Sequence, residues 1–170
     1  MSKDYLSDTN FATNLFVTSR VDHSKAYSFW QKVNVLGGRI YISRIAIAEV
    51  EYGLALNPKI SPTVKQQMEA GIKAYQVKEI GKHTTPHYAQ IRAELFDKKA
   101  PRDKKGKIKR GLSPEQFTAL KPTAYEFGIQ ENDLWMAAIA VELNMTLITA
   151  DRMNQLKSVF PSLNLEDWTL

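Results

Sequence analysis

Short apolar runs rich in β-branched residues alternate along the chain with longer segments of helical periodicity. Strands are predicted at 5–7, 39–43 and 146–149, and Leu163 and Leu165 indicate a last edge strand. Runs of this kind are typical of parallel strands that are covered on both faces. Their alternation with helices predicts an α/β fold, a three-layer α/β/α arrangement around a short parallel sheet.

Polar caps and apolar periods indicate where the helices lie. Thr9 or Asn10 is expected to cap a helix that carries Phe11, Leu15 and Phe16. Further helices are predicted, in chain order, at about 24–35, 44–56, 62–78, 87–97, from 113 onward, and around 153–159.

The helix capped by Ser43 has an apolar stripe at helical spacing. The residues expected to be buried there are Ile45, Ala48, Tyr52 and Ala55. Gly53 lies in the same helix, where a glycine is costly and usually permits another group to come close.

The segment from Glu131 to Asp151 holds a helix, a turn and a strand with an acid near each end. Asn132 is expected to be the N-cap, which puts Asp133 in the first turn, where the helix dipole favours negative charge. The run 134–141 is apolar on nearly every side, and such a helix is buried. Asp151 follows the carboxyl end of the strand 146–149, where α/β sheets usually place ligand groups.

The 170 residues suffice for one domain, 1–170, with a substantial core. The chain has no cysteine, which excludes disulfides and thiolate zinc sites. The N-terminal sequence has no apolar signal segment and no stretch is long enough to span a membrane, so a cytoplasmic protein without a membrane segment is expected.

The net charge of +5 originates in one segment, 98–111, which holds eight basic residues against Asp103 alone. Such a basic loop is either a solvated tether or a surface that holds a phosphate backbone. For the second alternative the RNA-binding candidates are Lys104, Lys105, Lys107, Lys109 and Arg110.

Four acids share a topological position: Asp8, Glu49, Asp133 and Asp151. Each lies at a strand end or in the first turns of the following helix, and in a parallel sheet these places meet at one rim. The carboxylates would repel one another unless a cation neutralised them, and oxygen ligands favour Mg²⁺ or Mn²⁺ over Zn²⁺. Such a cation can activate water against a phosphate. Each acid also has a simpler explanation as a helix cap, an ion-pair partner or a turn residue.

Other chemical candidates are weaker. His23 and His83 have no acidic or serine partner at motif spacing, and neither has His87. The three tryptophans, Trp30, Trp135 and Trp168, are expected to be core or interface residues rather than base-stacking groups.

The segments YLSDTN, ISRIAIAEVEYG and NDLWMAAIAVELNMTLITAD, followed by a terminal strand with Trp168, together resemble a PIN domain. Within that superfamily the chain is similar to the VapC-type toxins of bacterial type II toxin–antitoxin modules. The resemblance spans nearly the whole chain, and the segment 98–111 then looks like a basic loop insertion that could supply RNA contacts of its own.

The resemblance implies an endoribonuclease that uses Mg²⁺ or Mn²⁺ to direct water at an RNA phosphodiester, commonly in transfer RNA. It implies that the four acids are the catalytic and metal-binding residues, supported by Asn10 and Thr149. It further implies a cognate antitoxin protein and a homodimer.

Two alternatives stay open, a catalytically silent PIN-fold RNA-binding protein and a PIN nuclease without an antitoxin. The apolar residues of the first two helices are either core or part of an antitoxin groove; they are Phe11, Leu15, Phe16, Tyr27 and Trp30.

Overall fold

The computed structural model describes residues 3–99, 102–107, 129–150 and 153–170. In these residues a five-stranded sheet has the order β3-β2-β1-β4-β5, and all its pairings are parallel. The strands are β1 (Asp4–Ser7), β2 (Arg39–Ser43), β3 (Val77–Lys78), β4 (Thr146–Ile148) and β5 (Asn164–Glu166). The predicted α/β fold with a short parallel sheet is confirmed.

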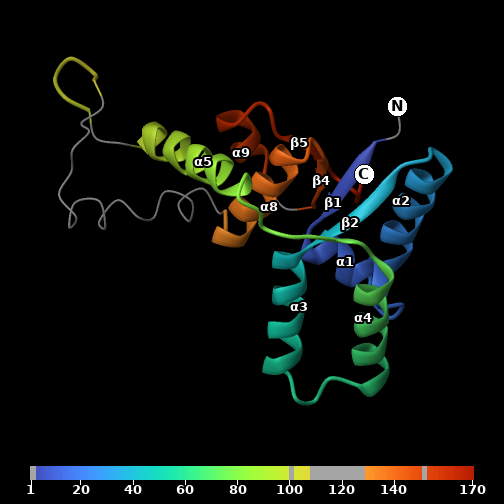
Figure 1. Cartoon of the computed structure of the whole chain (residues 1–170). Helices are drawn as coiled ribbons and strands as arrows, with labels where there is room; N and C mark the ends of the chain where they lie inside the picture. The colour runs from blue at the N-terminus through green and yellow to red at the C-terminus, as the bar shows by residue number, and fades with distance from the viewer. Residues whose placement is uncertain (1–2, 100–101, 108–128, 151–152) are drawn as a thin grey trace.

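Helices connect the strands on both sides of the sheet (Figure 1). The described helices are α1 (Thr9–Phe16), α2 (His23–Val35), α3 (Arg44–Leu56), α4 (Pro62–Ala74), α5 (Thr84–Lys99), α8 (Glu131–Glu142) and α9 (Asn154–Val159). The helix expected from residue 113 onward lies outside the described residues.

Alternating strand residues build two separate cores, one on each face of the sheet. Tyr5 and Ile148 pack with Phe11 and Phe29 from α1 and α2. Leu6 and Leu147, which are paired in register, belong to the larger core that the buried side chains of α3, α5, α8 and α9 form. Two apolar faces covered by helices explain why the strands read as continuous apolar runs.

Helix α8 is buried as its composition predicted. Leu134, Ala137 and Ile139 are each 0% exposed. Its closest helical neighbour, α5, contributes Ile91 and Leu95, which are also 0% exposed.

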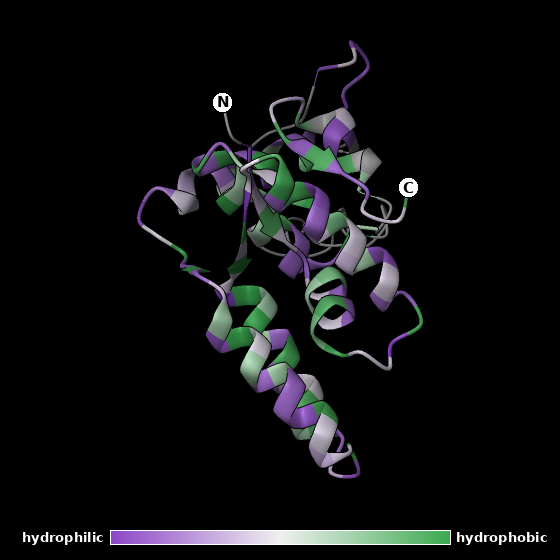
Figure 2. Cartoon of the chain, turned by 90° about the vertical axis from the view of Figure 1, so that its right-hand side faces the viewer, coloured by the Kyte–Doolittle hydropathy of each residue, from purple (hydrophilic) through white to green (hydrophobic). Residues whose placement is uncertain are grey.

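The stripe predicted for α3 is wrong. The buried residues of this helix are Ala46, Ile47 and Val50, whereas Tyr52 is 65% exposed. Helices α3 and α4 form a hairpin that extends beyond the sheet, so its far half has no sheet to cover. Hydrophobic and hydrophilic residues are mixed along this hairpin (Figure 2). A Cβ added at Gly53 would meet no atom within 4 Å, so the close approach expected there is not found.

Three boundaries also differ from expectation. Helix α4 ends at Ala74 rather than near Lys78, because residues 77–78 pair with β2 as a further strand. The N-cap of α1 is Asp8, and the N-cap of α8 is Gln130 instead of Asn132. No described helix is both long enough and apolar enough to cross a membrane.

Candidate functional site

Three acidic side chains line one pocket at the carboxyl end of the sheet. Asp8 directly follows β1, Glu49 lies in the second turn of α3, and Asp133 lies in the first turn of α8. The pocket has a volume of about 210 Å³, and its other lining residues are Thr9, Asn10, Gln130 and Met136. Strand β1 pairs with β2 on one side and β4 on the other, so the pocket lies where α/β sheets usually bind ligands.

The position of Asp8 is set by the sheet and by the helix that it begins. Its side chain is buried, and Oδ1 accepts a hydrogen bond of 2.6 Å from the backbone N–H of Phe11. The backbone N–H of Asp8 donates to the carbonyl of Ile148 at 3.1 Å, which joins the residue to β4. The negative charge is therefore held at the N-terminus of α1, where the helix dipole stabilises it.

Glu49 joins three helices at the pocket. Its Oε2 accepts a hydrogen bond from the Thr9 hydroxyl at the start of α1, and its Oε1 accepts one of 2.7 Å from the Asn132 amide in α8. Both carboxylate oxygens thus have neutral donors, which orient the group and leave its negative charge in the pocket.

Asp133 is held by its own helix. Its Oδ2 accepts a hydrogen bond of 2.8 Å from the backbone N–H of Gln130, the N-cap residue of α8. This capping arrangement satisfies one N-terminal donor and aligns the carboxylate with the helix dipole. The neighbouring first-turn acid, Glu131, instead lies outside the pocket and pairs with Tyr88 and Arg92.

The donor set of the pocket is made of oxygen ligands, since three carboxylates and the side-chain oxygens of Thr9 and Asn10 line it. This chemistry fits a hard divalent cation such as Mg²⁺ or Mn²⁺. Within the ranges that the structure describes, no three acidic or histidine side chains are close enough together to form a ready-made ion site.

A comparison with family models places these acids in a known fold. The model of the PIN domain matches residues 5–159, most of the chain. The chain belongs to the PIN domain family. The fold predicted from the four sequence segments is therefore shown.

Solved structures that resemble this PIN domain agree with it over nearly their whole length. VapBC-1 from nontypeable Haemophilus influenzae is 22% identical with a TM-score of 0.64, covering 98% of this chain and 99% of that one. VapBC2 from Rickettsia felis, bound to a promoter DNA fragment, is 22% identical with a TM-score of 0.63, covering 97% and 98%. DNA-bound VapBC from Salmonella typhimurium is 19% identical with a TM-score of 0.61, covering 98% of both. No curated protein matches the sequence significantly.

The remaining predicted residues of the PIN site have different outcomes. Asp151 lies outside the described residues. Thr149 is buried just past β4, where its backbone N–H donates to the carbonyl of Glu166 at 3.1 Å. Asn10 is exposed and lines the pocket, and its supporting role stays a prediction.

Three residues of the pocket were not anticipated from the sequence. Gln130 and Met136 line it, and Asn132 binds Glu49 instead of capping α8. The spacing of 130, 133 and 136 does place these residues near one face of α8, which was a usable signal once the helix start was known.

The basic segment begins within a helix, because residues 98 and 99 are the last of α5. Beyond it, residues 102–107 form a compact turn in which Asp103 Oδ1 accepts backbone N–H bonds from Lys105 at 2.8 Å and Lys107 at 2.9 Å. Arg102 donates to the carbonyl of Asp97 at 3.2 Å, which ties the turn to α5.

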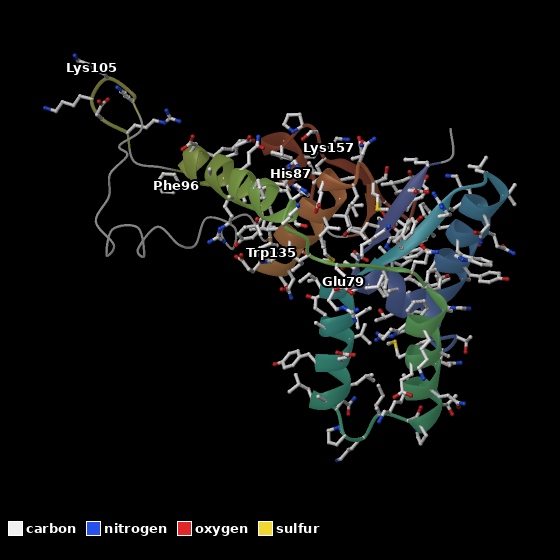
Figure 3. The ribbon with its side chains drawn as sticks, viewed as in Figure 1. Glu79, His87, Phe96, Lys105, Trp135 and Lys157 are labelled. Atoms are coloured by element: carbon white, nitrogen blue, oxygen red, sulfur yellow. The ribbon has the colours of Figure 1, made fainter. Side chains whose placement is uncertain are left out.

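The turn presents its positive charges to solvent. Lys104, Lys105 and Lys107 are exposed, and Figure 3 shows Lys105 at the tip of the loop, far from the sheet. Lys109 and Arg110, the other two predicted RNA-binding residues, lie outside the described residues.

Proposed function

We propose that this PIN domain is a metal-dependent endoribonuclease and the toxin of a type II toxin–antitoxin module. The observation that carries the proposal is the convergence of Asp8, Glu49 and Asp133, from three separate helices, on one pocket of a PIN fold. Asp151 is assigned as the fourth acid from the sequence alone, in which it follows β4, the strand that neighbours β1.

The residues of the pocket have distinct roles in this proposal. Asp8, Glu49 and Asp133, with Asp151, would hold Mg²⁺ or Mn²⁺ through their carboxylates. When bound, the ion would activate water and stabilise the charge that develops on the RNA phosphate. Thr9 and Asn132 orient the Glu49 carboxylate in the pocket.

An antitoxin partner is supported by the solved neighbours, which are toxin–antitoxin complexes. Of the apolar residues considered for an antitoxin groove, Phe11 is core, at 1% exposed, and Leu15 and Phe16 are partly buried against the core clusters. Tyr27, 43% exposed, stacks on Trp30 with ring centroids 5.4 Å apart, and this pair on α2 is the better candidate for contact with an antitoxin. A homodimer in the cytoplasm completes the proposal.

The test is incubation of purified protein with a total RNA pool and with transfer RNA, in Mg²⁺, in Mn²⁺ and in EDTA. We expect discrete products that require the metal, because a site of fixed geometry selects particular phosphodiesters. Binding of RNA without cleavage in either metal would favour the silent PIN-fold binder. Cleavage in EDTA would overturn the metal role of the acids.

Neutralising the basic turn should weaken RNA binding without changing the pocket. Replacing Lys104, Lys105 and Lys107 with glutamine should reduce the magnitude of the slope of log affinity against log salt by up to about 2. The reason is that binding releases fewer counterions when fewer phosphates are contacted. Fluorescence anisotropy with labelled transfer RNA at several salt concentrations measures the slope.

The matched control removes three exposed lysines from the α3–α4 hairpin, namely Lys59, Lys65 and Lys73. Both triple variants lose the same charge, so a general electrostatic effect would change both slopes equally. An unchanged slope in the turn variant would make residues 102–107 a solvated tether.

A further inference from the structure

A stack of three side chains lies outside the acidic pocket, between α5 and α8. The rings of Tyr88 and Trp135 are parallel, with centroids 3.8 Å apart and planes 8° apart. The guanidinium of Arg92 lies over the Tyr88 ring at 5.8 Å. The order of the stack is therefore Arg92, Tyr88, Trp135.

Glu131 holds two members of this stack through hydrogen bonds. Its carboxylate accepts hydrogen bonds from the Tyr88 hydroxyl and, at 2.5 Å, from Arg92. Burial, followed by the bond to Glu131, raises the pKa of Tyr88 to about 12, so the hydroxyl stays protonated and donating at neutral pH. The rings are thus pre-organised before any ligand arrives.

Trp135 lies at one end of the stack and is partly exposed to solvent. Its neighbours in sequence, Leu134 and Met136, are 0% and 2% exposed, whereas Trp135 remains partly exposed. Among the residues that the structure describes, Tyr88 is the one ring that stacks on it.

The stack shares the N-terminal turns of α8 with groups that would hold the scissile phosphate. Trp135 follows Asp133 by two residues, so the two side chains are about 3 Å apart along the axis of α8 but lie on opposite sides of the helix. It lies three residues from Asn132, which binds Glu49, and residues three apart are neighbours on a helix surface. Figure 3 shows Trp135 at the end of α8 that lies against α3, the helix that carries Glu49.

We propose that Trp135 is a nucleobase-stacking platform, on which an unpaired base of the RNA, outside the acidic pocket and near the N-terminal turns of α8, extends the Arg92–Tyr88–Trp135 stack. This inference rests on the proposed ribonuclease function and names how that site recognises its substrate. An acidic pocket repels the RNA backbone, so a contact that does not depend on the phosphate charge is what it needs. Stacking on an indole supplies such a contact for any base.

The test measures RNA binding and cleavage separately. Binding of a short, labelled, single-stranded RNA of mixed sequence is measured in EDTA. The proteins compared are Asp8→Asn alone and Asp8→Asn carrying either Trp135→Leu or Trp135→Phe. Leucine keeps an apolar side chain but removes the flat ring, so affinity should fall about 10-fold. Phenylalanine should retain most of the affinity while abolishing the part of the RNA-induced fluorescence quenching that comes from Trp135.

Two controls separate stacking from other effects. Tyr52→Leu removes an exposed aromatic ring of α3, 65% exposed, and should leave the affinity unchanged. An abasic version of the RNA keeps its phosphates but has no base to stack. Trp135→Leu and its parent should therefore bind the abasic RNA with equal affinity. Cleavage is measured in protein that retains Asp8. There Trp135→Leu should raise KM for RNA cleavage more than it lowers kcat.

The outcomes distinguish this inference from the proposed function. Equal affinity of Trp135→Leu and its parent, in protein that binds and cleaves RNA, overturns the stacking platform alone. Equal losses on the normal and abasic RNA also overturn it, because the effect would not come from the base. Absence of all RNA binding and cleavage overturns the ribonuclease function and this inference together.

Discussion

Replacing Asp8 with asparagine is expected to lower metal-dependent RNA cleavage by about 100-fold or more. Loss of the carboxylate weakens the binding of a cation that would stabilise the transition state by several kcal/mol. The fold should persist because asparagine is as good an N-cap as aspartate. Its side-chain oxygen can still accept the bond from the Phe11 N–H. Cleavage assays and thermal unfolding of the same preparations measure both effects.

The control for this variant is Asp4→Asn, at the opposite end of the same strand. Asp4 is bound to Arg39 at 3.0 Å and lies away from the pocket, so cleavage should be unaffected. Full activity of Asp8→Asn, with the control behaving as expected, would exclude Asp8 from the catalytic acids.

The second large effect is expected for Asp133, whose replacement by asparagine should reduce cleavage by a similar factor, about 100-fold. The same substitution should also weaken Mn²⁺ binding measured by calorimetry without RNA, because the carboxylate is one of three that line the pocket. This binding measurement does not depend on the identity of the RNA.

Glu131→Gln is a matched control because it removes a negative charge from the same first turn of α8. Both substitutions lose the same favourable interaction with the helix dipole, about 0.3–1 kcal/mol. Only Asp133 lines the pocket, whereas Glu131 binds Tyr88 and Arg92. Equal losses of Mn²⁺ affinity in the two variants would show a dipole effect instead of ligation.

Four of the described strands and the buried helix of this PIN domain were predictable from the sequence because their patterns have one structural solution, whereas the two residues of β3 were expected at the end of a helix. The run 146–148 is apolar on both faces, and all three of its residues are buried between helical layers. Helix α8 is apolar on nearly every side, so its burial did not depend on choosing a face.

Helix α3 was not predictable in the same way. It carries apolar residues in several directions, so periodicity could not decide between Ala48 and Val50, and the structure buries Val50. Where a helix leaves the sheet depends on contacts between distant segments, such as α1 with α3 and α4. The site had a similar limit: strand ends located Asp8, but only the packed helices show that Asn132 binds Glu49.

The double use of Asp8, as a helix cap and as a proposed catalytic acid, has a genetic consequence. Aspartate and asparagine codons differ by a single base, and asparagine preserves the capping bond that Asp8 makes to Phe11. If the protein is the toxin proposed above, a poisoned cell would therefore escape most easily through a point mutation that leaves a folded, abundant and harmless protein. Such a product could still occupy the proposed antitoxin, so the inactive allele would interfere with regulation of an intact copy in the same cell.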